Sequence, residues 1–299
     1  MTVDVLVEVS VGSQNQMFTY NVNHDLQSKI QPGVRVIVPF GSRKLEGFVI
    51  KVNNLSNADL DLKDVVDIVD ETPVLNDELL DLGNYMSHLY LAPLIHCYQT
   101  MLPVALKAKK RTNIKVKEDK YICLNKSESE IDSYIASNKS ILQKQILNMV
   151  LTLKKVRKQD IDNVGVLKTL INKGLLKEIR EEIYRLKSDD IDNQAIHELT
   201  TDQREAVNQF LTGEKDVHLL HGVTGSGKTE VYMNIIDRML LDGKGAIVLV
   251  PEIALTTQLI ARFQNHFGKN VAILHSRLSD GEKYDEWRKI ERHEVSIVI

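Results

Sequence analysis

The sequence predicts a multidomain chain that combines α+β and α/β parts. Three observations support this fold class. Short segments of alternating apolar residues fill the N-terminal part, helical patterns dominate a basic middle, and strand–helix repeats surround a glycine-rich loop near the C-terminal end. We therefore expect a small N-terminal β-barrel-like domain, then a winged helix, then part of a parallel α/β domain built on a phosphate-binding loop (P-loop).

Length and composition are those of a globular protein. The 299 residues suffice for two or three domains, and 43% of them are hydrophobic. Cys97 and Cys123 are the only cysteines, and their spacing suits neither a metal site nor a redox pair, so the sequence predicts a reduced, intracellular setting. The sequence shows neither a signal peptide nor an apolar run of membrane-spanning length. We therefore expect a cytoplasmic protein with no membrane partner.

Charge is distributed unevenly along the chain. Residues 106–188 are rich in Lys and Arg, whereas residues 1–105 and 189–299 have an excess of Asp and Glu. We take these three segments as the predicted domains. A basic middle is typical of a segment that contacts nucleic-acid phosphates, but it is as typical of a solvated surface, and charge alone does not choose between the two.

The N-terminal domain begins with the alternation of apolar and polar residues that half-buried strands show. Turns such as Gln31-Pro32-Gly33 separate the segments. The predicted strands are 3–9, 18–22, 34–38, 47–52 and 65–69. Short strands at this spacing favour a small, partly closed barrel.

A helix is expected after these strands. It begins at Asn76, whose side chain can cap the first turn, and ends before Pro93. Its predicted buried stripe consists of Leu79, Leu82, Tyr85, Met86, Leu89 and Tyr90. We assign these apolar positions to the hydrophobic core rather than to a binding site.

A basic linker begins the second domain. It lacks apolar periodicity, and its charge suits a DNA backbone. The central basic residues are Lys109, Lys110 and Arg111.

Three short helices and a hairpin are expected next, a combination typical of a winged helix. The predicted elements are a strand at 121–124, helices at 139–153, 157–161 and 164–173, and a hairpin over 175–185. Gly174 is expected to cap the third helix. Lys168 and Lys173 on that helix could read a DNA groove, or the domain could serve only contacts between domains; both hypotheses stay open.

The third domain has the strand–helix repeats of a parallel sheet with helices on both faces. Thr200 and Gln203 form a capping box at its first helix, and Ser279 begins its last helix. The predicted strands are 217–221, 246–250, 271–275 and 295–299, and further helices cover 230–241 and the segment that ends at Phe267.

The glycine-rich loop matches the pattern G-x-x-x-x-G-K-[ST] at every fixed position. Its residues are Gly222, Val223, Thr224, Gly225, Ser226, Gly227, Lys228 and Thr229. Glycines let successive N–H groups face the phosphates of a nucleotide, and the helix that follows adds a favourable dipole. We expect Lys228 to lie along the β- and γ-phosphates and the Thr229 hydroxyl to ligate Mg²⁺. The alternative is a glycine-rich turn that binds nothing.

Several segments together resemble superfamily 2 helicases, and among these the replication-restart helicases. They are the P-loop, the pair Thr200 and Gln203, the run Pro251-Glu252-Ile253-Ala254-Leu255-Thr256, and the pair His275-Ser276. The N-terminal part is similar to the 3′-end DNA-binding domain of that family through Phe18-Thr19-Tyr20 and the run 32–41. Many families share the P-loop, whereas the Pro-Glu run combined with the N-terminal part is specific.

The resemblance implies ATP and Mg²⁺ as cofactors, with Gln203 near the adenine. It also implies that forked and single-stranded DNA with a 3′ end, primosome proteins and single-strand-binding proteins are partners. The elements facing single-stranded DNA would carry Glu252, Thr256, Thr257, His275 and Ser276. Phe18, Thr19 and Tyr20 would help to bind the 3′ end, although strand spacing alone favours a core position for both aromatic residues. Many members of the family carry an acid where this chain has Thr19.

The resemblance also implies parts that these 299 residues do not contain. Superfamily 2 helicases use a D-E-x-H motif whose carboxylates hold Mg²⁺ and position the attacking water, and no such motif follows Thr229 here. A second helicase lobe and a zinc module are likewise expected only outside this sequence. We therefore expect an N-terminal portion, cut within helicase lobe 1, that hydrolyses ATP poorly or not at all.

The leading hypothesis is an ATP-dependent 3′→5′ DNA helicase that recognises stalled or abandoned replication forks and initiates primosome assembly and replication restart. The alternative is a non-enzymatic module that binds forks and 3′ ends and recruits partners. A P-loop kinase for a small molecule is disfavoured, because no segment is predicted to form a lid or an acceptor pocket.

Overall fold

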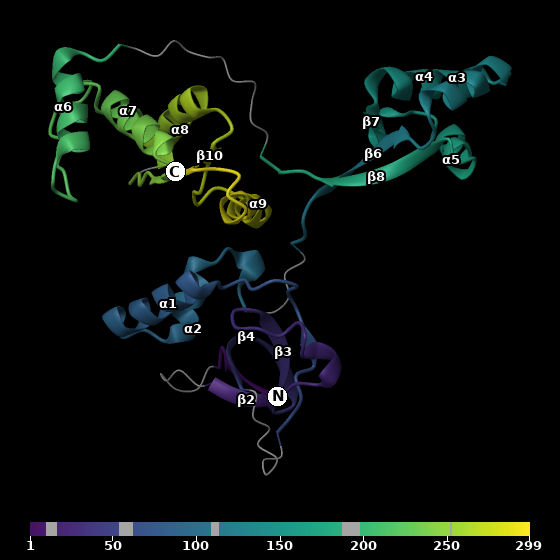
Figure 1. Cartoon of the computed structure of the whole chain (residues 1–299). Coiled ribbons are helices and arrows are strands. Elements are labelled where there is room, and N and C mark those ends of the chain that lie inside the picture. The colour runs from purple at the N-terminus through teal and green to yellow at the C-terminus, as the bar shows by residue number, and fades with distance from the viewer. Residues whose placement is uncertain (10–16, 54–61, 109–113, 187–197, 252) are drawn as a thin grey trace. The chain divides into compact units, whose positions relative to one another are not determined.

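A computed structural model describes residues 1–299 except for 10–16, 54–61, 109–113, 187–197 and 252 (Figure 1). The chain divides into two compact units. The first combines residues 1–114 with 188–299, and the second consists of residues 115–187.

The first 70 residues form an antiparallel sheet, as their alternation predicts. Its strands are β1 (Thr2–Val7), β2 (Met17–Asn21), β3 (Arg35–Phe40), β4 (Arg43–Asn53) and β5 (Asp67–Ile68), in the order β2-β1-β4-β3-β5. The buried side chains include Val3, Val5, Val36, Val38 and Val49. Asp64 bridges Asn21 of β2, and Val66 donates its N–H to the Ile37 carbonyl of β3, so the segment before β5 contacts β2 at one end of the strand order and β3 near the other end.

Helix α1 (Asp77–Tyr90) begins at the predicted cap, where Asn76 Oδ1 accepts the Leu79 N–H at 2.9 Å. The predicted buried stripe is wrong in part. Its exposed members are Leu82, Tyr85, Leu89 and Tyr90. Apolar residues occur on several sides of α1, and the side that is buried is set by α2 (Leu94–Met101), a helix that the sequence did not predict. Gly83 of α1 packs directly against the Tyr98 ring of α2.

The unit of residues 115–187 contains an antiparallel sheet in the order β7-β6-β8 and three described helices. Its elements are β6 (Glu118–Leu124), α3 (Glu128–Ser137), α4 (Ile141–Leu153), β7 (Lys155–Arg157), α5 (Val164–Asn172) and β8 (Leu176–Glu182). Helices and sheet share a core that includes Ile122, Leu147, Val150, Leu167 and Leu170. The strand that comes first in the chain, β6, is therefore the central one.

Two predictions for this unit are wrong. The expected helix at 157–161 is β7 followed by a single 3₁₀ turn, Lys158–Asp160, and the expected hairpin over 175–185 is the single strand β8. The reason is long-range pairing: β8 pairs along its whole length with β6, and the β7 residue Val156 lies opposite Ile122 in the core. Gly174 does end α5 as predicted, with a φ of 69°.

A matched pair of glycines provides a test of this packing. Gly83→Ala would place a Cβ 2.1 Å from Tyr98 Cε1, so α1 or the Tyr98 ring must move. We expect a loss of about 1–3 kcal/mol in the free energy of unfolding. Gly165 lies in α5, and a Cβ added there would have no neighbouring atom within 4 Å, so Gly165→Ala should raise stability by about 0.5–1 kcal/mol. Urea unfolding of both variants measures this, and an equal response would contradict it.

Residues 198–299 contain a parallel sheet in the order β10-β11-β9, as the strand–helix repeats predict. The elements are α6 (Thr201–Thr212), α7 (Lys228–Leu241), β9 (Ala246–Ile247), α8 (Ile253–Phe267), β10 (Val271–Ala272), α9 (Asp280–Glu291) and β11 (Ile297–Val298). The predicted capping box at Thr200 is present, and α9 begins after Ser279 as predicted, where a second capping box forms with Glu282. Met233 of α7 and Phe263 of α8 share one core with Ile297 of β11.

Residues 217–221 do not form the predicted strand. Val217 and Leu219 are 85% and 91% exposed, and Leu249, which follows β9, is 89% exposed. Apolar residues of a parallel sheet are usually covered on both faces. In the described residues β9 pairs only with β11, so no described strand pairs with its other edge. None of the helices that the structure describes is long and apolar enough to cross a membrane.

Candidate nucleotide and nucleic-acid sites

The P-loop has the backbone that its glycines predict. Gly225 and Gly227 have φ angles of 82° and 80°, a left-handed region in which a larger side chain is strained. Gly227 is also the N-cap residue of α7, and no side chain caps this helix. The Glu230 N–H already donates to the Gly227 carbonyl at 3.0 Å, but no side chain caps the N–H groups before it, and the helix dipole favours negative charge there.

Lys228 places its ammonium over this loop. Its Nζ donates hydrogen bonds to the carbonyl oxygens of Gly222 and Val223, both at 2.8 Å. A positive charge, an uncapped helix start and a glycine-rich backbone thus surround one position, which suits a di- or triphosphate. Thr229 follows in the first turn of α7, with its side chain half-buried. The donor set therefore fits the nucleotide and the Mg²⁺ that the motif predicts.

Gln203 links α6 to the loop. Its Oε1 accepts the Thr200 N–H at 2.9 Å, which closes the capping box, and its Nε2 donates to the Ser226 carbonyl at 3.0 Å. A Cβ at Gly227 would lie 2.2 Å from the same Nε2. The side chain predicted to lie near an adenine therefore also supports the phosphate loop directly, a role that the sequence did not reveal.

We expect Gln203→Ala to lower nucleotide affinity by up to about tenfold, because one hydrogen bond to the loop is lost. Loss of the capping box should also lower stability by about 1 kcal/mol. Gln209→Ala is the matched control on α6, since the Gln209 amide bonds Glu205 Oε1 at 3.1 Å within the helix. Titration with a fluorescent adenine nucleotide measures the affinity of both variants. Equal affinities for the two variants would contradict the role of Gln203 in supporting the loop.

Two contacts missed by sequence reasoning hold α8 against α7. Arg262 of α8 pairs with Glu230, the residue after Thr229. Further along each helix, His266 Nε2 lies 2.8 Å from Asp237 Oδ2. Because α8 begins within the Pro-Glu run and α7 begins within the P-loop, these pairs connect the helices of the two motifs. Glu230 and Asp237 lie seven residues apart on one face of α7, and this spacing could have indicated an acidic face that contacts basic residues of another helix.

The predicted DNA contacts of the third domain are only partly described. Glu252 lies outside the described residues, and Thr256 and Thr257 belong to α8 but their side chains lie outside the description. His275 and Ser276 form a turn after β10, in which the Arg277 N–H donates to His275 Nδ1 at 3.2 Å. Since β9 and β10 are both parallel to β11, the segments that follow them leave the sheet at the same edge.

The three N-terminal candidates have different environments. Tyr20 is 5% exposed, its Oη donates to the Pro39 carbonyl at 3.2 Å, and burial raises the pKa of its hydroxyl. Phe18 packs edge-on against Phe40 with the ring centroids 5.1 Å apart. Thr19 is exposed and donates its hydroxyl to Asp4 Oδ1 at 2.7 Å. In this conformation Thr19 and the half-buried Phe18 reach the surface, whereas Tyr20 belongs to the core.

The basic unit uses much of its charge internally. Lys154 pairs with Glu128 at 2.5 Å, and Lys158 and Lys120 both pair with Glu178, whose pKa the Lys158 ammonium lowers most. The linker residues Lys109, Lys110 and Arg111 lie outside the described residues. Lys168 of α5 is exposed, and among the described residues it has no ion-pair partner. Lys173 donates to the Tyr134 hydroxyl at 2.7 Å.

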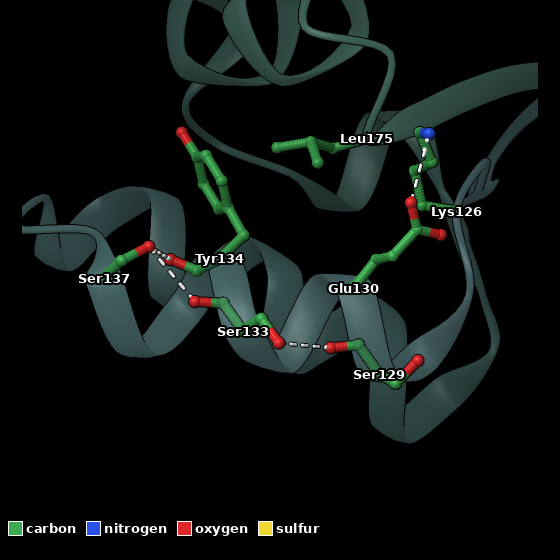
Figure 2. Close-up of a pocket in the computed structure, with 7 residues that line it drawn as sticks. All are labelled: Lys126, Ser129, Glu130, Ser133, Tyr134, Ser137 and Leu175. Carbon is green, nitrogen blue, oxygen red and sulfur yellow. Dashed lines mark hydrogen bonds and ion pairs between the residues drawn. The ribbon is translucent and has the colours of Figure 1, made fainter.

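Figure 2 shows a pocket of about 490 Å³ in this unit. It is lined by Lys126, Ser129, Glu130, Ser133, Tyr134, Ser137 and Leu175. Its polar groups already have partners nearby, since Ser133 Oγ donates to the Ser129 carbonyl at 2.8 Å and Lys126 pairs with Glu130 at 3.2 Å. The pocket therefore offers few free donors, and we do not assign it to the nucleotide.

Two parts of the chain match known protein families. Residues 4–103 match the family described as 3′DNA-binding domain (3′BD), and residues 200–299 match the family described as DEAD/DEAH box helicase. The chain is similar to proteins named Replication restart protein PriA. In Bacillus subtilis the identity is 36%, with 99% of this chain and 46% of the relative covered.

Two other relatives with the same name give comparable matches. The protein of Chlamydia pneumoniae is 30% identical, with 100% of this chain and 41% of the relative covered. The protein of Haemophilus influenzae is 29% identical, with 95% and 40% covered. The chain thus spans less than half the length of each of these relatives.

Proposed function

Because this chain belongs to the PriA-type replication restart proteins, we propose that it carries the DNA-binding part and the ATP-binding half-site of a 3′→5′ DNA helicase. The whole protein recognises stalled or abandoned forks and initiates primosome assembly in the cytoplasm. The observation that carries the proposal is the geometry of the P-loop, where Lys228 and Gln203 bond the loop at the start of a helix that no side chain caps. The same chain also matches the 3′DNA-binding domain family.

In the nucleotide site each residue has a distinct task. Lys228 exchanges its two loop carbonyls for β- and γ-phosphate oxygens, while the Thr229 hydroxyl holds Mg²⁺. Gln203 keeps the loop in place and faces the adenine. Bound Mg²⁺ supplies positive charge that offsets the charge developing on the transferred phosphoryl group.

We propose that hydrolysis needs acidic residues from outside these 299 residues. The sequence supports this, because no D-E-x-H motif follows Thr229 in these 299 residues. The chain by itself therefore binds ATP but turns it over slowly. A helicase-like hydrolysis rate of the 299-residue chain on single-stranded DNA would contradict this division.

The N-terminal domain, residues 1–105, is proposed as a small barrel that binds a 3′ end through Phe18 and Thr19. Contact of the segment before β5 with both β2 and β3 supports closure of its sheet. Residues 115–187 are proposed as a winged helix, supported by the three helices packed on a three-stranded sheet. The exposed Lys168 of α5 is its candidate duplex contact. Primosome and single-strand-binding proteins are the proposed protein partners.

A DNA end with a single chemical difference tests the 3′-end proposal. We expect the chain to bind a labelled duplex with a 3′-hydroxyl about tenfold more tightly than the same duplex with a 3′-phosphate, a difference of about 1.4 kcal/mol. Fluorescence anisotropy measures both affinities. Repeating it at several salt concentrations separates recognition of the 3′ end from the salt-dependent contribution of contacts to DNA phosphates. Equal affinities for the two ends would contradict the assignment of residues 1–105.

The alternative function is a non-enzymatic module for fork binding and recruitment. The match of residues 4–103 to the 3′DNA-binding domain family favours this alternative, because DNA binding by that domain does not depend on the P-loop. The two functions are separated with the whole protein and its Lys228→Ala variant on a forked substrate. Unwinding that is lost in the variant while fork binding persists supports the helicase, and absence of unwinding by either protein supports the module.

A further inference from the structure

Helix α9 buries three charged residues. Asp285 and Glu286 are 0% and 1% exposed, and Arg288 is 4% exposed. Arg288 Nη2 lies 2.9 Å from Asp285 Oδ1, and Glu286 Oε2 accepts the Ile273 N–H at 2.9 Å. Burying a charge costs free energy unless the charge is paired and hydrogen-bonded. The buried charges of α9 are therefore weak evidence that the helix adds stability, and better evidence that it is held in one specific position.

The helix contacts two different parts of its unit. On one side it contacts β10 of the parallel sheet, and on another it contacts η2 (Val104–Leu106), the last turn of the N-terminal part. Trp287, the single tryptophan of the chain, packs against the cluster that surrounds Phe48 and Tyr98. Residues far apart in sequence are thus joined within one compact unit.

Both contact partners of α9 are held firmly. Arg35 of β3 donates from Nη1 to the carbonyls of Ala105 and Lys107, at 3.1 and 3.3 Å, which ties η2 to the N-terminal sheet. On the other side, the bond from Ile273 to Glu286 fixes α9 at the end of β10, immediately before the turn at His275. A displacement of η2 would therefore move α9 and the turn with it.

We propose that α9, through Trp287 and the Asp285–Arg288 pair, couples 3′-end binding by residues 1–105 to nucleotide binding at the P-loop. The inference rests on the proposed function and adds the route between its two sites. Dense packing transmits displacement between alternative arrangements rather than absorbing it, and linkage requires that the effect be reciprocal. Each ligand therefore changes the affinity for the other by the same factor.

The test measures that factor in the 299-residue chain. Affinity for a 3′-hydroxyl duplex is determined with and without saturating ADP and Mg²⁺, and affinity for ADP with and without the duplex. We expect ADP to change the affinity for the duplex by a factor of about five or more, and the duplex to change the affinity for ADP by the same factor. Trp287→Ala should bring the factor to about one while each separate affinity stays within about twofold, because Trp287 is outside both sites. Trp287→Phe should keep it, as should the matched control Tyr85→Ala at an exposed position of α1.

A measurement on the unmodified chain guards against a variant that folds poorly. Binding of the 3′-hydroxyl duplex should change amide hydrogen exchange in α9 and η2 and shift the emission of Trp287. A factor of one in the unmodified chain, an unchanged factor in Trp287→Ala, or unaltered exchange in α9 would overturn the proposal. If neither ligand binds, the proposed function falls as well, whereas binding of both without coupling removes only the route through α9.

Discussion

Replacing Lys228 by alanine is expected to weaken binding of ATP and Mg²⁺ by about 100-fold or more. The Lys228 ammonium makes two hydrogen bonds of 2.8 Å to loop carbonyls, so it is already directed at the position that the phosphates would occupy. Hydrogen bonds to charged groups contribute about 1.5–3 kcal/mol each, and two of them account for a loss of this size. Titration with a fluorescent ATP analogue in the presence of Mg²⁺ measures the effect.

Lys244→Ala is the matched control for this prediction. Lys244 is an exposed lysine in the same part of the chain, beyond the end of α7, and its replacement removes the same charge without touching the loop. We expect the nucleotide affinity of this variant to stay within about twofold of that of the unmodified chain, because exposed charges contribute little at a distance. Similar losses in the two variants would mean that net charge, and not the geometry of the P-loop, attracts the nucleotide.

Elements set by local signals could be predicted from the sequence. The capping box at Thr200, the start of α9 after Ser279, the Asn76 cap and the Gly174 end of α5 all depend on bonds within one turn, and each lies where the sequence places it. The left-handed glycines of the P-loop belong to the same class. For these features the residues that decide the structure are neighbours in sequence.

Elements set by distant partners could not be predicted. The single strand β8 replaces a hairpin because β6, more than 50 positions earlier, pairs along its length. The buried side of α1 depends on Tyr98 in α2, since apolar residues occur on several sides of the helix. Residues 217–221 look like a buried strand, yet no described strand pairs with them and they stay exposed. Periodicity reports how apolar a segment is, but not which neighbour covers it.

The candidate site shows the same limit. The motif identified Lys228 and Thr229, whereas the hydrogen bond from Gln203 to the loop and the Glu230–Arg262 pair required three dimensions. For Tyr20 the two sequence arguments differed: the family resemblance proposed it for DNA, whereas strand spacing favoured the core, and the fold places it among the buried valines. The polar helix α9 gave no sequence signal of burial, since Asp285 and Arg288 pair within the helix and the bond from the Ile273 N–H to Glu286 comes from another element.

Arg35→Met is expected to lower the free energy of unfolding by about 3–5 kcal/mol, since it breaks a buried ion pair by removing one partner. Arg35 is 7% exposed, and its Nε and Nη2 bind both oxygens of Asp70, at 2.8 and 2.6 Å. Methionine fills much of the same volume but leaves the Asp70 carboxylate without these donors. It also releases the carbonyls of Ala105 and Lys107, so η2 loses its attachment to β3. Urea unfolding followed by circular dichroism measures the loss.

The double variant Arg35→Met with Asp70→Leu separates the cost of an uncompensated charge from the loss of packing. Removing both partners leaves no buried unpaired carboxylate at position 70, so the double variant should recover about 1–3 kcal/mol relative to Arg35→Met alone. Arg43→Met, at an exposed position of β4, controls for loss of a positive charge and should change stability by less than about 0.5 kcal/mol. If the losses of Arg35→Met and Asp70→Leu simply add in the double variant, Arg35 and Asp70 are not energetically coupled. The attachment of η2 would then depend on the carbonyl bonds of Arg35 rather than on its carboxylate partner.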